Sequence, residues 1–204
     1  MIPVYPTTYF GSVIYYKNLV QHANVLIETK EHFPKQSYRN RCDILSADGI
    51  LSLSIPVKKP NGSKTPTEEI ELANHENWRA RHWRAIKTAY QSAPYFDFYG
   101  IEVHDLIHRN DKLLIDFNDT IQQGIIDWLD LPIECSRTSE FLSIQENDPR
   151  VILVDKNRNN EFEESPYIQV FPTEHSFTPN ISILDAIMCA GPLARNLLLP
   201  TKQL

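Results

Sequence analysis

The stretch MIPVYPTTYFGSVIYYKNLVQHANVLIETK, residues 1–30, decides the fold. The short segment Ile2–Tyr5 is rich in β-branched and aromatic residues, which predicts a brief strand. Apolar residues between Tyr9 and His22 recur near the helical period, and the run Val25-Leu26-Ile27 predicts a buried strand. A strand, a helix and a second strand in succession form a βαβ-like opening, so we predict an α/β fold.

The remainder of the chain extends this pattern. The turn residues Ala47-Asp48-Gly49 lie between Cys42–Leu45 and the alternating run Ile50–Val57, which predicts a β-hairpin with one buried face. Helical periodicity predicts helices at 78–93, 101–109 and 111–130, and Ser182 with Asp185 three residues later is a near capping box that predicts a helix at 182–190. Short strands are predicted at 69–73, 133–135 and 151–154. We therefore predict one domain over residues 1–204, a mixed sheet with flanking helices.

Composition limits the class of protein. The chain has 204 residues, 42% of them hydrophobic and 23% charged, as in an ordinary globular domain, which excludes a disordered or collagen-like chain. It contains no apolar run long enough for a membrane span and no secretory signal. Its three cysteines, Cys42, Cys135 and Cys189, have no metal-type spacing. We therefore expect no integral membrane segment, no metal site and a reducing, cytoplasmic location.

Charge is distributed unevenly. The net charge of −6 disfavours a dedicated nucleic-acid binder. Residues 1–100 hold 12 basic and 9 acidic residues, net +3, whereas residues 101–204 hold 8 and 17, net −9. This asymmetry places an anionic ligand against the first half, or else reflects a solvated acidic surface in the second.

The strongest chemical signal lies between residues 35 and 42. Its polar members are Lys35, Ser37, Arg39, Asn40 and Arg41. The planar guanidinium forks of two arginines grip phosphate or carboxylate through paired hydrogen bonds, so we predict an anion clamp. In an extended segment Arg39 and Arg41 would share a side. The alternative is a basic strand tied to nearby acids such as Glu28 and Glu31.

His82 is the candidate general base. It lies on the apolar stripe of the predicted 78–93 helix with Trp78 and Ile86, where a hydrogen-bonded core histidine is the alternative. Cys42 follows a cation, so a nucleophilic thiolate with His32 or His82 as base is a further candidate, and a small buried apolar residue is the alternative. The sequence contains no glycine-rich phosphate loop, nucleophile elbow or zinc-protease motif.

Several phrases together resemble the WbqC-like proteins. They are Tyr9-Phe10 after a proline-containing opening, Lys35-Gln-Ser-Tyr-Arg-Asn-Arg-Cys42, Leu53-Ser-Ile-Pro-Val57, Trp78 with His82 and Ile86, Tyr90-Gln-Ser-Ala-Pro-Tyr-Phe96, Tyr167-Ile-Gln-Val-Phe171, Phe177-Thr-Pro-Asn-Ile-Ser-Ile-Leu-Asp185 and Gly191-Pro192. In contrast to the family pattern, Gly11 follows Tyr-Phe, and a Tyr-x-Ser-Gly stretch before residue 160 is missing. The resemblance implies a place in bacterial surface-polysaccharide synthesis, with a glycyl or other acyl transfer to a sugar.

Two functional hypotheses follow. In the first, the chain is a transferase that takes an activated anionic donor for surface-polysaccharide (O-antigen) synthesis, with Arg39 and Arg41 on the anion and His82 as base. In the second, it is a non-catalytic module that binds a sugar phosphate or a partner, with Trp78 and Tyr95 stacking on sugar rings. Lys35, Ser37 and Asn40 complete the expected binding site. The residues specify no cofactor and no oligomeric state.

Overall fold

A parallel three-stranded sheet forms one side of the molecule. The computed structural model describes residues 2–34, 36–58, 64–74, 76–146, 148–153, 164–171 and 177–199. The strands β1 (Val4–Pro6), β2 (Asn24–Glu28) and β5 (Glu134–Arg137) are ordered β1-β2-β5. Leu26 in the central strand pairs with Val4 on one side and Ser136 on the other, parallel in both cases.

The βαβ-like opening is confirmed. Helix α1 (Val13–Leu19) connects β1 to β2 and begins at Ser12, whose hydroxyl accepts a hydrogen bond from the Tyr15 amide at 3.2 Å. The helix is shorter than predicted, because Phe10 adopts a positive φ of 41° and so keeps the preceding residues out of a helix.

The predicted hairpin is also present. Strands β3 (Arg41–Ser46) and β4 (Gly49–Ser54) pair antiparallel in a separate two-stranded sheet, and Gly49 takes a φ of 99° at the turn. The α/β class is confirmed, with parallel and antiparallel pairs in two sheets. The predicted buried face holds for Leu53 and Ile55, but Leu51 is 39% exposed.

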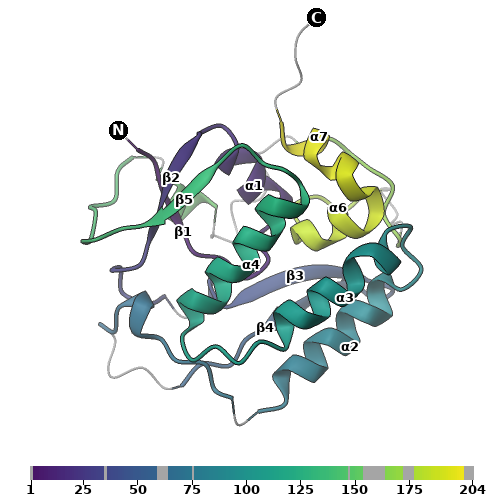
Figure 1. Cartoon of the computed structure of the whole chain (residues 1–204), viewed down its shortest axis with the longest axis horizontal. Helices are drawn as coiled ribbons and strands as arrows, with labels where there is room; N and C mark the ends of the chain where they lie inside the picture. Colours follow the sequence, from purple (N-terminus) through teal and green to yellow (C-terminus); the bar gives the residue numbers. More distant parts are fainter. Residues whose placement is uncertain are drawn as a thin grey trace, which may run out of the picture.

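Helices surround both sheets. Four longer helices each overlap a predicted helix. They are α2 (Trp78–Tyr90), α3 (Phe96–Ile107), α4 (Leu114–Trp128) and α6 (Ile183–Ala190). The shorter ones are η1 (Thr67–Glu69), α5 (Pro149–Ile152), η3 (Gly191–Leu193) and α7 (Ala194–Leu198). In Figure 1, α4 crosses in front of the parallel sheet, α2 and α3 flank the hairpin, and α6 and α7 close the remaining side.

Two predicted strands are absent. The 69–73 segment follows η1 and forms isolated bridges, at Glu71 and Leu72, in place of a ladder. The strand predicted at 151–154 is also wrong. Residues 151–153 lie in α5 and the turn after it, because Asp148 caps that helix and Pro149 starts it. Val154 lies outside the described residues. Within the described part of the chain, no helix is long and apolar enough to cross a membrane.

Candidate functional site

The predicted anion-clamp segment is a turn that leads into strand β3 at Arg41. Residues 36–40 have turn or bend geometry, and Gln36 takes a φ of 59°. Arg39 and Arg41 therefore do not share a side as they would in an extended segment. Arg39 points to Glu31, and Arg41 points to Ser54. Lys35 lies outside the described residues.

Arg39 forms a buried ion pair that leaves its fork free. Its Nε donates to Oε1 of Glu31 at 2.5 Å, and its side chain is only 2% exposed. Among the described residues, its terminal nitrogens Nη1 and Nη2 make no hydrogen bond. A buried guanidinium with open donors is costly unless an acceptor meets it, so the fork of Arg39 is free to donate to a further acceptor.

The fork borders a cleft with two different walls. The cleft has a volume of about 670 Å³, within the range of small-molecule sites. One wall is polar and consists of Lys30, Glu31, His32, Ser37 and Arg39. The facing wall is apolar and consists of Phe141, Ile144 and Val151, all of them exposed large side chains. A ligand with one polar and one apolar face, such as a sugar ring, matches this pairing.

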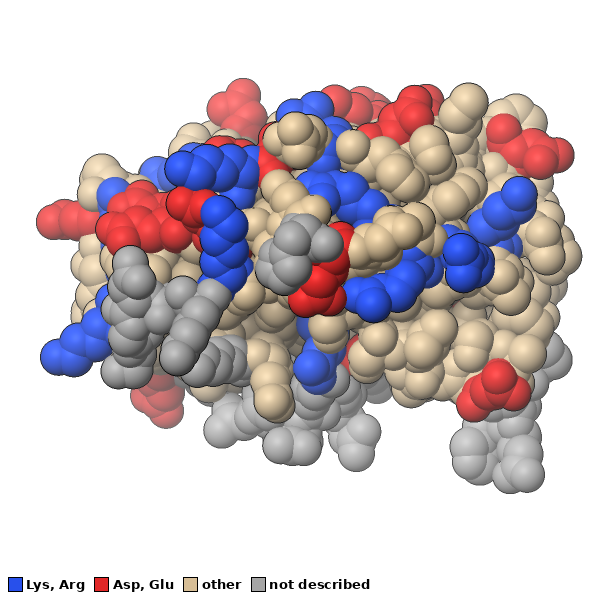
Figure 2. Space-filling view, turned by 90° about the horizontal axis from the view of Figure 1, so that it is seen from below, with Lys and Arg blue, Asp and Glu red and all other residues tan. Residues whose placement is uncertain are grey.

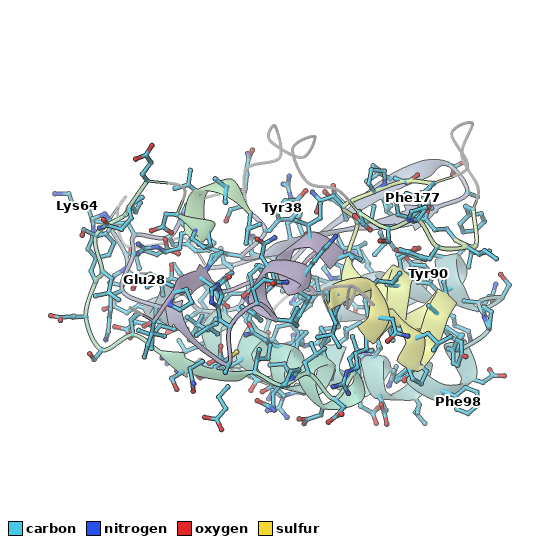
Figure 3. All side chains as sticks on the ribbon, turned by 90° about the horizontal axis from the view of Figure 1, so that it is seen from above. Glu28, Tyr38, Lys64, Tyr90, Phe98 and Phe177 are labelled. Atoms are coloured by element: carbon cyan, nitrogen blue, oxygen red, sulfur yellow. The ribbon has the colours of Figure 1, made fainter. Side chains whose placement is uncertain are left out.

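A buried charge network holds the apolar wall in place. Arg150 donates to Glu28 Oε2 at 3.0 Å, to Asp148 Oδ2 at 2.5 Å and to the carbonyls of Leu142 and Ser143. All of its donor nitrogens are used, because its Nε also bonds Asp148. Figure 3 shows Glu28 at the same end of the molecule as Lys64. Arg150 therefore ties Leu142, Ser143 and Asp148 to Glu28 in β2 and has no donor nitrogen left for a ligand.

The other predicted residues meet at the end of β4. Arg41 Nε donates to the Ser54 hydroxyl at 2.9 Å, and His82 Nε2 bonds the Ser54 carbonyl at 3.2 Å. The side-chain amide of Asn40 donates to the carbonyl of Ile55 at 2.9 Å. Asn40, Arg41 and His82 thus bond the adjacent residues Ser54 and Ile55 but do not line the cleft described above, which Arg39 and Ser37 border.

His82 is held neutral in the core. A carbonyl oxygen can only accept a hydrogen bond, so Nε2 of His82 carries the hydrogen and donates to Ser54. Nδ1 then accepts a hydrogen bond from the hydroxyl of Tyr9 at 2.9 Å. Burial lowers the pKa of His82 to about 4. Both ring nitrogens are occupied in this arrangement, and the assignment of His82 as general base stays a prediction.

The aromatic candidates are packed and not open. Trp78 is fully buried, with its ring 5.1 Å from that of His82. Tyr95 is half-buried, and a Cβ placed on Gly191 would lie 2.4 Å from its ring. In this arrangement Trp78 supports the histidine and Tyr95 supports the C-terminal helices.

The cysteines are not activated. Cys42 is 1% exposed, and burial raises the pKa of its thiol well above the ordinary value, with a smaller contribution from Asp43. The cation beside it in sequence, Arg41, turns toward Ser54. The buried apolar alternative describes Cys42. Among the residues that the structure describes, no three His, Cys, Asp or Glu are grouped to hold a metal ion.

Sequence reasoning missed the far wall of the cleft. Phe141, Ile144 and Arg150 come from a segment without periodicity, more than one hundred residues after Arg39. The one local signal was Asp148-Pro149, which marks a helix start and so fixes where Arg150 lies.

Comparison with known proteins places most of the chain in one family. The model of the WbqC-like protein family matches residues 7–161. The chain belongs to the WbqC-like family. This match includes both walls of the cleft and the Asn40-Arg41-His82 cluster. Membership suggests a role for this WbqC-like chain in a polysaccharide-related pathway. No curated protein and no solved structure matches it.

Proposed function

We propose that this WbqC-like chain is a cytoplasmic transferase of bacterial surface-polysaccharide synthesis that moves an acyl or aminoacyl group from an activated, anionic donor to a sugar. The open guanidinium fork of Arg39 on the wall of the cleft carries this proposal. The fork binds the phosphate or carboxylate of the substrate, and Phe141 packs on the apolar face of the sugar.

The charges around the fork make the geometry of a ligand more important than its net charge. Glu31 neutralises Arg39, and Glu68 pairs with Lys30 at 2.7 Å. A ligand therefore gains little from net charge, and it gains most from matching the two parallel N–H groups of the fork. We infer that the site selects planar carboxylates and phosphates by geometry.

The transfer step needs a proton acceptor. A sugar hydroxyl or amine forms a bond to the acyl carbon of the donor, the bond to the leaving group breaks with its electron pair, and the proton passes to a base. His32 stands on the polar wall of the cleft, so we propose it as that base. His82 lies outside this cleft and bonds the Ser54 carbonyl, so in this proposal it has a structural role.

The alternative is a non-catalytic binding module of the same pathway. The exposed apolar wall of Phe141, Ile144 and Val151 supports it, because such side chains also fit a partner or a sugar phosphate that is held without reaction.

Binding is tested by thermal-shift and calorimetric titration with uridine diphosphate sugars, hexose phosphates and acetyl-coenzyme A. We expect at least one of them to stabilise the wild type, and Arg39→Lys to weaken it by about tenfold or more, because lysine keeps the charge but loses the fork. Arg41→Ala is the matched control and keeps the affinity. Loss of binding in Arg41→Ala alone would move the anion site to the Ser54 cluster and contradict the proposal.

Transfer is tested by mass spectrometry of sugar acceptors incubated with the donor that binds. A product heavier by the acyl group, formed by the wild type and lost in His32→Ala, supports the transferase. Binding without any product identifies the binding module. Product formation that survives His32→Ala but is lost in His82→Gln would return the base role to His82.

A further inference from the structure

A second hollow lies between the outer edge of β4 and helix α2. It has a volume of about 460 Å³. Its apolar part consists of Ile50, Leu51, Ala85, Ala89 and Phe171, and two arginines, Arg81 and Arg84, stand beside it. Figure 3 shows Glu28, near the cleft, and Tyr90, at the end of α2, in opposite halves of the molecule. This β4–α2 groove is therefore separate from the cleft.

The strand that borders the groove has an unpaired edge. Ser46 and Gly49 close a two-residue turn, so the register makes Leu51 and Leu53 bond to β3. The backbone groups of Ile50 and Ser52 then point away from β3. Among the described residues they have no hydrogen-bond partner, whereas the next such carbonyl, that of Ser54, is taken by His82. The free edge thus covers Ile50 and Ser52 and ends at Ser54, where His82 of α2 bonds the carbonyl.

The side chains along this edge are unprotected. Ile50 is 60% exposed and Leu51 is 39% exposed. Native edge strands usually carry charges, proline or a covering segment, because an open edge pairs with any extended chain. An exposed apolar edge beside a groove is the arrangement that proteins use to bind a peptide as an added strand.

The charge of the groove specifies what binds there. Arg84 makes no ion pair within the described part of the chain, and Arg81 pairs only with the exposed Glu76 at 3.1 Å. Helix α2 contains no acidic residue, and Asp48 is the acid that lines the groove. Figure 2, seen from below, shows basic side chains over much of this face, with acidic side chains gathered mainly at its left and along its rim. This local positive charge, in a chain of net charge −6, favours an acidic occupant.

We propose that the β4–α2 groove binds an extended, acidic peptide segment of a partner protein, which adds a strand to the free edge of β4. Backbone groups of the peptide pair with those of Ile50 and Ser52. Alternate side chains then point to opposite faces, so glutamates or aspartates reach Arg81 and Arg84 while apolar side chains cover Leu51 and Ala85. The proposal does not depend on the transferase activity.

The test uses the full chain and two labelled peptides. One is the heptapeptide Thr-Glu-Val-Glu-Val-Glu-Thr, and the other has lysine in place of each glutamate. By fluorescence anisotropy we expect the acidic peptide to bind at least about tenfold tighter than the basic one. Arg84→Glu and Ile50→Pro should each weaken it about tenfold or more, the first by charge and the second by removing an edge N–H. Lys112→Glu, the same charge change outside the groove, should change the affinity less than about twofold.

Hydrogen exchange separates strand pairing from loss of folding. The acidic peptide should slow exchange at the Ile50 and Ser52 amides of the wild type by about tenfold or more. Equal binding of the two peptides, or no added protection at these amides, overturns the proposal. So does a stable dimer in light scattering that the peptide leaves intact, because β4 then pairs with a second copy. Binding of an anionic polysaccharide or RNA at Arg84 without any binding of the peptide overturns it as well.

Discussion

The hydroxyl of Tyr9 donates to Nδ1 of His82 over 2.9 Å, and the Ser54 carbonyl bonds the opposite ring nitrogen at 3.2 Å. This pair of bonds fixes one neutral tautomer of a histidine that is 5% exposed. Charging the ring would place an unpaired cation beside Trp78 and would break the bond from Tyr9.

His82 therefore makes the fold sensitive to acid. Its pKa falls from 6.5 to about 4 on folding, so between these values the unfolded chain binds the proton and the folded chain does not. The contribution to stability is complete above pH 6.5 and is lost as the pH falls toward 4, by about 3 kcal/mol. In urea titrations from pH 7 to pH 4, the wild type should lose about that much more unfolding free energy than His82→Gln. Parallel pH profiles of the two proteins would contradict this.

Arg39 and Arg41 should differ in their effect on stability. Removing Arg39 leaves the carboxylate of Glu31, which is 11% exposed, without its cation, and this costs about 3 kcal/mol or more. Arg41 bonds a hydroxyl at an exposed position, so Arg41→Ala should cost less than about 1 kcal/mol. Chemical denaturation of both variants compares them directly. Rescue of Arg39→Ala by a second change, Glu31→Gln, would confirm the buried charge as the cause.

The three cysteines should react slowly in the native protein. Burial raises the pKa of Cys135 to about 11 and that of Cys189 to about 12, and it also raises the pKa of Cys42 well above its ordinary value. The thiolate is the reactive form, so alkylation by iodoacetamide near pH 8 should be at least about tenfold slower than in concentrated guanidinium chloride. Rapid modification of one thiol in the folded state would contradict this prediction and support a nucleophilic cysteine.

Gly191 should not tolerate a side chain. It takes a φ of 56°, and an added Cβ would lie 2.4 Å from the ring of Tyr95. We expect Gly191→Ala to lower the unfolding free energy by about 2 kcal/mol or more, from backbone strain and overpacking together. Gly124→Ala is the matched control. It lies within α4, and its nearest neighbour is a methyl of Leu106 at 3.3 Å, so it should change stability by less than about 1 kcal/mol.

Local patterns predicted most of the fold. Periodicity predicted α2 and α4, because each has an apolar stripe that local spacing reveals, and the cap at Ser182 predicted α6. The turn residues before Gly49 predicted the hairpin. The strand predicted at 151–154 failed because the cap at Asp148 and the proline after it outweigh the β-branched residues that follow.

The candidate site was only half predictable. Arg39 and Arg41 stand out by residue type, but the turn at residues 36–40 that separates them depends on the positive φ of Gln36, which residue type does not indicate. The facing wall depends on Arg150 reaching Glu28, a contact between residues 122 positions apart. No short-range spacing encodes such a contact, because it arises only when β5 and the segment after it pack against β2.

The order of strands in the parallel sheet affects how the chain is made. The centre of the sheet, β2, is synthesised early, whereas its neighbour β5 follows only after the hairpin and three long helices. During translation one edge of β2 therefore stays open until residues 134–137 leave the ribosome. A nascent chain that stalls before that point exposes the unpaired edge of β2 to other chains, so a pause there raises the risk of aggregation.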